Sequence, residues 1–407
     1  MSDSKSAAYK MAAQLPPAPR RLRLGLVGGG GGGFIGPVHA LAARMDDRFE
    51  LVAGALSSRP EVAQQAAKSF FIAPDRAYAD YRKMATAEAA RPDGVEVVAI
   101  TVPNHLHYDV AKAFLQAGIH VICDKPLTTR LEDALELSAL VAQTQLGFFV
   151  THAFAAYPMV REARRLVRDG RLGEVRLAHV EFVMDWLTEP IDQMGDRQAA
   201  WRTDPATSGP GGAIADIGTH AYHLARFVTG QDVVRLSAAL HTLVPGRRLD
   251  DTGHLLLTFA NGAQGTMILT QVAPGNECGL RIRVYGTRAG LEWRQDTANY
   301  LTFAEQGRPT QTLGRGEASL SPESQRMTRV PRGHPEGYLE AFANVYSEAA
   351  VALLAKVEGR PVDCPIECAT IEDGVLGVAF VEAAVRSSRE GGAWVDPRPG
   401  ASSAIRS

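Results

Sequence analysis

The sequence predicts an α/β protein with two domains: an N-terminal doubly wound parallel sheet, and a C-terminal α+β domain with an open, mainly antiparallel sheet. Three observations lead to this prediction. The chain has 407 residues, which is more than one typical hydrophobic core holds. Short apolar segments alternate with helical patterns up to about residue 150, as in βαβ units. Beyond that point strand-like segments follow one another without helices between them, as in antiparallel sheets.

The domain boundaries follow from the places where these patterns change. Residues 1–20 are expected to be a flexible tail, and residues 21–150 are expected to be the first domain. Residues 151–395 are expected to form the second domain, with the C-terminal helices included, and residues 396–407 a second tail.

The first domain is expected to contain five parallel strands, at residues 22–27, 49–56, 95–101, 120–123 and 147–151. The helices expected between them cover residues 35–45, 61–70, 108–117 and 131–144. Right-handed crossovers place such helices on both faces of the sheet, so a doubly wound arrangement is the natural solution.

The second domain is expected to begin with a helix at residues 159–168. Its strands are expected at residues 175–183, 234–242, 253–259, 265–271 and 280–285. Asn261-Gly262 is a hairpin signal between two of these strands. A stretch rich in Gly, Arg, Ser and Pro predicts a long loop at residues 306–333, before helices at residues 337–357 and 371–388.

Composition excludes several classes of function. The hydrophobic fraction of 45% and the charged fraction of 22% are ordinary for a soluble globular protein. The net charge of −2 and the lack of a basic block argue against a nucleic-acid or membrane-surface partner. The four cysteines form no CxxC pair, so neither a metal site nor a disulfide framework is indicated, and we expect a cytoplasmic protein. No apolar run has the length of a membrane span.

A block of glycines, GLVGGGGGGFIGPVHA at residues 25–40, joins the first expected strand to the first expected helix. Two registers of the GxGxxG pattern fit this block: Gly28, Gly30 and Gly33, or Gly31, Gly33 and Gly36. This strand–turn–helix context predicts a Rossmann domain that holds a dinucleotide pyrophosphate at a helix N-terminus. We expect Phe34 and Ile35, at the start of the helix, to line the same site. A flexible low-complexity loop is the alternative.

The end of the second strand bears on the choice between NAD and NADP. An acidic residue there accepts a hydrogen bond from the ribose of NAD, and this chain has none. Ser57, Ser58 and Arg59 stand in that place. They are suited to a 2′-phosphate, which slightly favours NADP. The hydroxyl groups also suit a free ribose, and the segment also fits a simple loop before Pro60.

Three further segments occur in order: VAITVPNHLH (98–107), HVICDKPLTT (120–129) and GPGGAIADIGTHAYHLARFVTG (209–230). Together they resemble the glucose–fructose oxidoreductase/inositol dehydrogenase (Gfo/Idh/MocA) family, from about Leu22 to the C-terminal helices. The expanded glycine loop, CDKP and HPEGY are most similar to the sugar-oxidising branch that includes glucoside 3-dehydrogenase-like enzymes.

The resemblance implies three active-site residues. Lys125, in the family's Lys-Pro pair, is implied to bond the reacting hydroxyl group; Asp124 stands before it where the family usually has Glu. Both are also expected at the cofactor. Asp216 and His220 match the family's Asp and His four residues apart, a spacing that puts both on one helix face. His220 is implied to be the general base, with Asp216 contacting the substrate or the base. By spacing alone, an Asp near a helix N-terminus and a core His fit equally.

Other residues are assigned by the same resemblance. Pro103, Asn104 and His107 match the family's loop beside the nicotinamide, although His107 is equally suited to cap the following helix. The family's usual Arg is missing from residues 151–164. Candidate substrate-binding residues are His152, Tyr157, Trp186, Trp201, Arg202 and His334. The aromatic members of this set are also suited to a hydrophobic core.

The resemblance implies reversible hydride transfer between NAD or NADP and a ring hydroxyl of a sugar, glycoside or cyclitol, without a metal. An inositol dehydrogenase is one alternative, and a regulatory protein that binds NAD(P) without catalysis is another. An open sheet with an apolar face would also favour a homo-oligomer.

Overall fold

The computed structural model describes residues 18–362 and 364–400, so most of both expected tails lies outside the described residues. The chain forms two compact units. The Rossmann unit contains the described residues up to Ala153 together with Phe342–Val378. The C-terminal unit contains Phe154–Ala341 and the described residues from Ala379 onward. The expected second domain included residues 342–378; in the structure this segment groups with the Rossmann sheet.

The sheet of the Rossmann unit has five parallel strands in the order β2-β1-β3-β4-β5. The strands are β1 (Leu22–Gly28), β2 (Phe49–Ala55), β3 (Val97–Thr101), β4 (His120–Cys123) and β5 (Phe148–Val150). Every residue of β3 and β4 is buried, which explains why both are continuous apolar runs. The parallel sheet expected from the sequence is confirmed.

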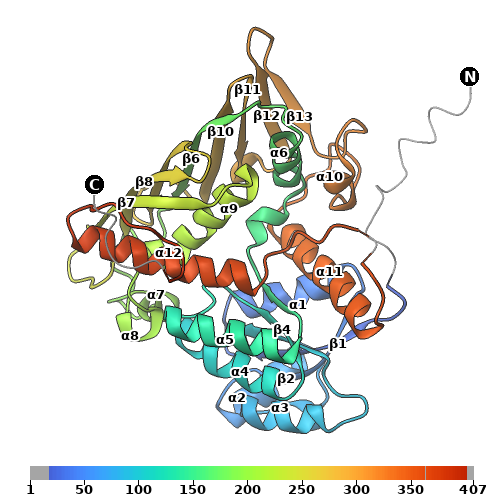
Figure 1. Ribbon diagram of the computed structural model, residues 1–407. Helices are drawn as coiled ribbons and strands as arrows, with labels where there is room; N and C mark the ends of the chain where they lie inside the picture. The colour runs from blue at the N-terminus through green and yellow to red at the C-terminus, as the bar shows by residue number, and fades with distance from the viewer. Residues whose placement is uncertain (1–17, 363, 401–407) are drawn as a thin grey trace, which may run out of the picture. The chain divides into compact units, whose positions relative to one another are not determined.

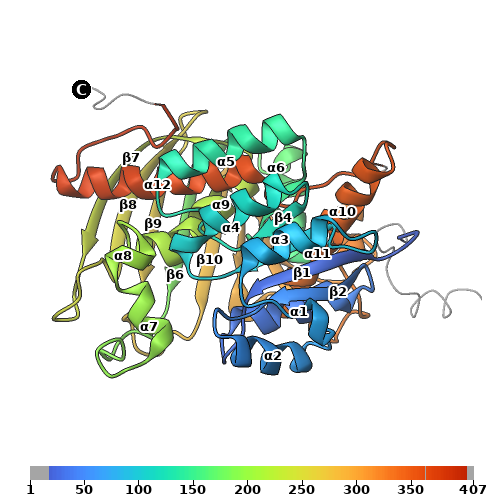
Figure 2. The same cartoon turned by 90° about the horizontal axis from the view of Figure 1, so that it is seen from below.

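Helices cover this sheet. They are α1 (Ile35–Met45), α2 (Pro60–Ser69), α3 (Tyr81–Ala89), α4 (His107–Gln116), α5 (Leu131–Thr144) and α11 (Tyr338–Val357), with short turns η2 (Pro74–Arg76) and η3 (Asn104–Leu106). Figure 2 shows α4 between α3 and α5. Tyr346 of α11 packs edge-on against Phe49 of β2 and hydrogen-bonds His39 of α1. This packing explains why residues 342–378 belong to the Rossmann unit.

The strand order defines where a ligand of this unit binds. Strand β1 has β2 on one side and β3 on the other, and Gly28 at its end is paired with Thr101 at the end of β3. The connections from β1 and β3 therefore leave in opposite directions. In open α/β sheets, ligands bind at this switch point, beyond the carboxyl ends of the strands.

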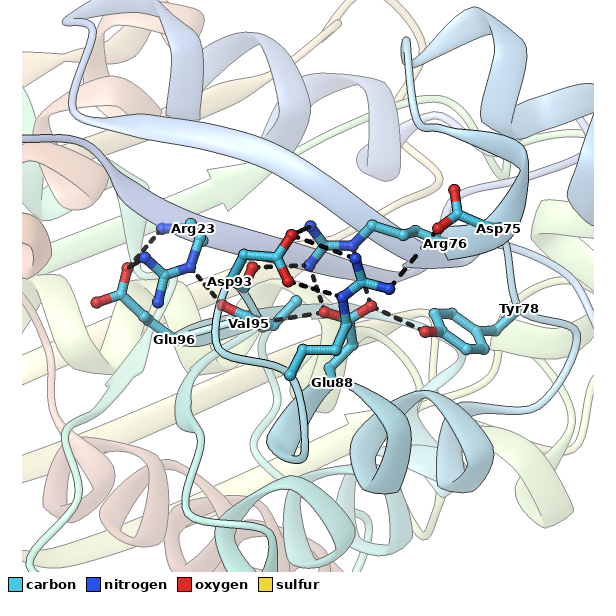
Figure 3. Close-up of polar contacts among 10 residues, drawn as sticks. Arg23, Asp75, Arg76, Tyr78, Glu88, Asp93, Val95 and Glu96 are labelled. Atoms are coloured by element: carbon cyan, nitrogen blue, oxygen red, sulfur yellow. Dashed lines mark hydrogen bonds and ion pairs between the residues drawn. The ribbon is translucent and has the colours of Figure 1, made fainter.

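In the Rossmann unit, a buried ion pair between Arg76 and Glu88 connects the turn η2 to helix α3 (Figure 3). The Glu88 carboxylate accepts hydrogen bonds from the Arg76 guanidinium, from the Tyr78 hydroxyl at 2.9 Å and from the Val95 amide at 3.2 Å. Burial, together with the bond to Glu88, raises the pKa of Tyr78 to about 12. Several donors on one carboxylate offset the desolvation that burying it costs.

The C-terminal unit contains an eight-stranded sheet in the order β13-β12-β11-β10-β6-β9-β8-β7. All neighbours pair antiparallel except β6 and β9, which are parallel. The strands are β6 (Val175–Val183), β7 (Val233–His241), β8 (Thr252–Phe259), β9 (Gln264–Thr270), β10 (Gly279–Gly286), β11 (Ala289–Arg294), β12 (Tyr300–Glu305) and β13 (Gln311–Gly314). The mainly antiparallel sheet is confirmed.

Helices pack on one face of this sheet, with α6 against β11 and β12 and α9 against β6 and β10 (Figure 1). The remaining helical segments are α6 (Pro158–Arg168), α7 (Arg197–Arg202), α8 (Pro205–Ser208), η5 (Ile214–Gly218), α9 (Thr219–Thr229), α10 (Pro322–Arg326) and α12 (Ile371–Arg389), with the short turns η4 (Ala153–Ala156) and η6 (Gln295–Thr297). The loop expected at residues 306–333 contains β13 and α10. Among the described residues, no helix is both long and apolar enough to cross a membrane.

The other face of the eight-stranded sheet carries exposed apolar side chains. Leu256 is 52% exposed, and Leu177, Ile268 and Tyr285 are also exposed. These residues stand on four adjacent strands and alternate with buried residues, so they share one face. The strand registers place His179, Thr266, Glu181 and Arg283 on the same face, so the apolar side chains stand among polar ones. Exposed apolar side chains on an open sheet face favour association between copies of the chain.

We predict that the protein is a homo-oligomer and that Leu256→Arg shifts it toward monomer, because an arginine desolvates poorly in an apolar interface. Light scattering after size-exclusion chromatography measures the mass. Leu135→Arg is the matched control, since Leu135 is an exposed leucine on α5. A native protein that elutes as a monomer would contradict this prediction.

Candidate active site

The glycine loop that follows β1 has no room for side chains at several positions. Gly28 and Gly29 have φ values of +92° and +80°, which L side chains rarely adopt. The Gly30 amide donates to the Leu56 carbonyl at 3.0 Å, and a Cβ on Gly30 would lie 2.3 Å from that oxygen. The loop is therefore held tightly between the ends of β1 and β2.

The structure shows which glycines of the two predicted registers are closely packed. A Cβ on Gly36 would lie 2.3 Å from the Gly29 Cα, so Gly36 lets α1 approach the loop. That is the role of the third glycine in the fingerprint. A Cβ on Gly33 would meet its nearest atom at 3.7 Å, an ordinary contact. Close packing thus belongs to Gly36, while Gly28 and Gly30 form the turn. The structure therefore combines the first two glycines of one predicted register with the last glycine of the other.

The open part of the loop fits a dinucleotide. Gly32 has a φ of +89° with nothing within 4 Å of a Cβ placed on it, and Gly31 also has a positive φ. These two residues and Gly33 lead into α1, whose first turn has no acidic side chain. Helix N-termini attract anions, so this loop suits a pyrophosphate. Phe34, just before α1, is exposed, and Ile35 is half-buried.

The Ser57–Arg59 segment follows Leu56, directly after β2. Ser58 and Arg59 are exposed, and the Ser57 hydroxyl accepts a hydrogen bond from the Arg59 amide at 3.2 Å. Arg59 is the N-cap of α2. The segment therefore begins a helix, as the simpler interpretation expected, and still presents a cation and a hydroxyl at the edge where an adenosine ribose is bound in Rossmann domains.

The loops after β3 and β4 are joined by His107. One imidazole nitrogen, Nε2, lies 2.9 Å from the Val102 carbonyl, and Nδ1 lies 2.8 Å from the Pro126 carbonyl. His107 is 1% exposed and does not cap α4. It thus connects the segment bearing Pro103 and the buried Asn104 to the segment bearing Lys125.

Asp124 is held by its own unit at the end of β4. The Thr151 hydroxyl donates to its carboxylate at 2.6 Å, and His39 Nε2 lies 4.0 Å from the same oxygen. The Nδ1 atom of His39 lies 2.8 Å from the Tyr346 hydroxyl. Burial lowers the pKa of His39 to about 4 despite the nearby carboxylate, so this imidazole is neutral near pH 7. Lys125, the next residue after Asp124, is half-buried.

In the C-terminal unit, Asp216 and His220 share one helix face. Asp216 lies in the π-helical turn η5 and His220 in the first turn of α9. Both are half-buried, whereas the residues between them, Ile217 to Thr219, are buried. The helix therefore presents the two side chains together on its accessible side, as the spacing predicted.

Several of the predicted residues lie around the Asp216 carboxylate. The Gln271 amide donates to its carboxylate at 2.8 Å, and Arg202 Nε lies 3.9 Å from the same oxygen. The Arg202 guanidinium stacks over Trp201 at 4.2 Å and lies 5.8 Å from the Trp186 ring. A carboxylate, a guanidinium and two indoles thus form one cluster. Indole faces and charged hydrogen-bonding groups are suited to a sugar or cyclitol ring.

The aromatic surroundings of His220 distinguish it from Tyr157. The His220 ring packs edge-on against Phe154 at 4.8 Å and near Phe182 at 6.3 Å. Tyr157 is 2% exposed, between Phe154 and Trp293, and burial raises its pKa. Tyr157 therefore packs as a core residue, which is the alternative that the sequence left open for the aromatic candidates. His152 is buried in the Rossmann unit. Its contact with the substrate stays a prediction.

His334 is exposed and lines a surface hollow with Asn299, Tyr300, Arg315 and Arg332. The Arg315 guanidinium shapes this hollow, because it donates to the carbonyls of Val330 and His334. Neither Asp216 nor His220 lines the hollow. The structure does not group His334 with the Asp216 cluster.

Two contributors were absent from the sequence-based set. Gln271 directly follows β9, so reasoning from strand ends would have found it. The Asp250 carboxylate accepts hydrogen bonds from the Gly212 and Ile214 amides at the start of η5. Contacts with backbone amides do not produce a recognisable sequence motif. Among residues 18–362 and 364–400, no group of three or more His, Cys, Asp or Glu side chains is placed to hold a metal ion.

Comparison with family models agrees with both units. Residues 22–152 match the model described as an oxidoreductase family with an NAD-binding Rossmann fold. Residues 160–292 match the GFO/IDH/MocA C-terminal domain. The fold and the glycine loop thus define an oxidoreductase that binds NAD(H). The chain belongs to the Gfo/Idh/MocA family.

Similar proteins match between 70% and 96% of the chain. An inositol dehydrogenase homologue from Azotobacter vinelandii, solved with NAD⁺, is 34% identical with a TM-score of 0.90, over 95% of this chain and 99% of that one. The structure described as that homologue with NADH and myo-inositol is 35% identical with a TM-score of 0.87, over 96% and 99%. The uncharacterized oxidoreductase YfiI of Bacillus subtilis (strain 168) is 33% identical, over 92% and 96%. Levoglucosan dehydrogenase of Pseudarthrobacter phenanthrenivorans is 28% identical, over 70% and 76%.

Alanine at two glycines tests which of them packs closely. Gly36→Ala is expected to weaken NAD binding about tenfold or more, because its Cβ forces α1 away from Gly29 and moves the anion site. Gly33→Ala is the matched control and is expected to stay within about twofold of the native affinity. Isothermal calorimetry measures both. Equal loss in the two variants would show that the registers are not distinguished by packing.

Proposed function

We propose that this chain is an NAD-dependent dehydrogenase that oxidises a ring hydroxyl group of a cyclitol, an inositol in particular. The observation that carries the proposal is the Asp216 cluster, in which a carboxylate and an imidazole share one accessible helix face beside a guanidinium and two indoles. Such a surface combines groups that bind a polyol ring with a base that can take its proton.

The protein residues supply proton transfer and charge stabilisation. His220 accepts the proton of the substrate hydroxyl, since a neutral imidazole is a base near neutral pH. Asp216 binds the substrate or stabilises the imidazolium that forms. Lys125 donates a hydrogen bond to the carbinol oxygen and stabilises its developing negative charge. When bound, the nicotinamide supplies the two-electron acceptor for the carbinol carbon.

The substrate class is supported by the relatives. The Azotobacter homologue was solved with NADH and myo-inositol, and its match covers almost the whole of both chains. None of the relatives named above is a glucoside 3-dehydrogenase, so we favour the cyclitol over the glucoside expected from the sequence. An anhydrosugar is the second candidate, favoured by the similarity to levoglucosan dehydrogenase.

A substrate panel tests the proposal. The purified protein is mixed with NAD or NADP and with inositols, levoglucosan, aldoses or glucosides, and reduced nicotinamide is followed by absorbance. Fastest turnover with an inositol supports the proposal, and fastest turnover with levoglucosan supports the second candidate. Cofactor binding without turnover on any polyol would instead favour the regulatory protein.

Two variants test the assigned chemistry. His220→Ala is expected to lower kcat by roughly a hundredfold or more, the usual effect of losing a general base. Lys125→Ala is expected to be comparably damaging, because it removes the charge that stabilises the alkoxide. The NAD affinity of the His220 variant should stay near the native value in calorimetry. Nearly native turnover of His220→Ala on the best substrate would refute the assignment.

A third variant tests cofactor choice. The slight preference for NADP stays a prediction, while the Azotobacter structures contain NAD⁺ and NADH. Arg59→Ala is expected to weaken NADP binding about tenfold, because it removes a cation suited to the 2′-phosphate, and to change NAD binding by less than about twofold. Calorimetric Kd values for both cofactors measure this. Equal effects on NAD and NADP would exclude a role for Arg59 in the choice.

A further inference from the structure

One residue, Asp250, holds the start of the helix that carries Asp216 and His220. Asp250 lies just before strand β8 of the C-terminal unit. The Asp250 carboxylate accepts from the Gly212 amide at 2.7 Å through one oxygen and from the Ile214 amide at 2.8 Å through the other. The Asp250 carbonyl accepts from the Ala213 amide at 2.8 Å. Three successive amides at the entrance to η5 therefore bind Asp250.

The fit at this point is close. A Cβ on Gly212 would lie 2.1 Å from the Asp250 carbonyl oxygen, so only glycine permits the approach. The Gly212 carbonyl in turn accepts from the Asp216 amide at 3.0 Å. The position of the Asp216 backbone is thus set, one hydrogen bond removed, by Asp250.

The neighbouring residue reaches the Asp216 side chain from the opposite direction. The Asp251 carbonyl accepts from the Gln271 amide at 3.0 Å, which fixes Gln271 beyond the end of β9. The Gln271 side chain is buried and donates to the Asp216 carboxylate at 2.8 Å. Asp250 therefore fixes the backbone that carries Asp216, and Asp251 fixes the donor to its carboxylate.

The same pair is connected to the loop that leads to the substrate-binding indoles. The Asp251 carboxylate lies 3.6 Å from Arg247, and both side chains are 1% exposed. Arg247 reaches the Asp192 carboxylate at 3.2 Å and the Glu189 carbonyl at 3.0 Å. Glu189 and Asp192 lie in the segment between Trp186 and helix α7, which carries Trp201 and Arg202. Burying a charge pair costs desolvation free energy, so we attribute to the Arg247–Asp251 pair the geometry of this loop rather than added stability.

We propose that Asp250 and Gln271 are positioning residues for the dehydrogenase reaction, holding Asp216, and through its helix His220, in the orientation that meets the substrate. This inference rests on the proposed function, because it assigns the two residues to the Asp216–His220 pair. Neither residue touches the reacting atoms; both act through Asp216.

The test uses Gln271→Leu and Asp250→Asn in the full-length protein. Leucine keeps much of the glutamine volume but cannot donate to Asp216. Asparagine offers one acceptor to the two amides that now bind two oxygens. Each is expected to lower kcat on the best ring polyol about tenfold or more, a loss equivalent to about 1.4 kcal/mol, with the calorimetric NAD affinity unchanged. Asp232→Asn is the matched control, because Asp232 binds Arg226 near the far end of α9 and is exposed.

A double-mutant cycle separates positioning from a general loss of structure. If Gln271 acts through Asp216, Gln271→Leu changes kcat by less than about twofold in an Asp216→Ala background, which offers no acceptor to the Gln271 amide. An equal effect in both backgrounds, or a native kcat with only a lowered melting temperature, overturns the proposal. If Asp250→Asn does not fold, the Gln271 cycle decides alone. Active His220→Ala and Asp216→Ala variants would refute the proposed function itself, whereas strongly impaired ones beside a native Gln271→Leu variant would refute only this inference.

Discussion

The contact between Gly29 and Gly36 is the constraint on which the Rossmann unit depends. A Cβ on either residue would fall within 2.7 Å of a backbone atom of the other, so the loop and α1 meet without side chains. This approach brings the N-terminus of α1 to the carboxyl ends of β1 and β3. The open glycines between the two contact points then face the switch point of the sheet, where an anionic group is stabilised by the helix.

In the C-terminal unit, the site residues instead lie on a mostly buried helix, formed by η5 and α9, with one accessible polar face. Ala215, Ile217 and Leu224 pack inward, while Asp216 and His220 remain half-buried. The wide turn η5 precedes α9, and the Asp250 contacts fix the entrance to that turn. Because burial anchors the rest of the helix, the two polar side chains are held by packing as well as by hydrogen bonds.

The strongly patterned parts of the fold were predictable from sequence. Helices α1 and α5 and strands β4 and β6 have the predicted bounds, because their apolar spacing or runs are unambiguous. Strands β11 and β12 were missed although buried side chains alternate in β11, because each strand has only six residues and the pattern extends over so few positions. The glycine register could not be chosen within six consecutive glycines, because it depends on which one meets the Gly29 backbone. The grouping of residues 342–378 was not predictable either, since an apolar helix face does not say which sheet it covers.

The same distinction holds for the site. Asp216 and His220 were identifiable because the family resemblance singles them out, whereas their helical spacing alone also fits a structural pair. Trp201 and Arg202 were candidates because they lie just upstream of the glycine-rich approach to Asp216. Asp250 acts through backbone amides, which leave no sequence signature, whereas Gln271 was overlooked although its place directly after β9 is a recognisable signal. For Tyr157 the sequence left a pocket role and a core role open, because an aromatic residue near a predicted site is indistinguishable in sequence from one in the core.

The central claim is that the chain removes hydrogen from the carbon of a ring hydroxyl and passes it to the nicotinamide. The most direct measurement uses an inositol deuterated at its ring carbons, incubated with the protein and NAD and followed by NMR of the recovered cofactor. We expect deuterium on the reduced nicotinamide ring together with a ketone in the polyol. Unlabelled cofactor, or a polyol recovered without oxidation, would contradict it.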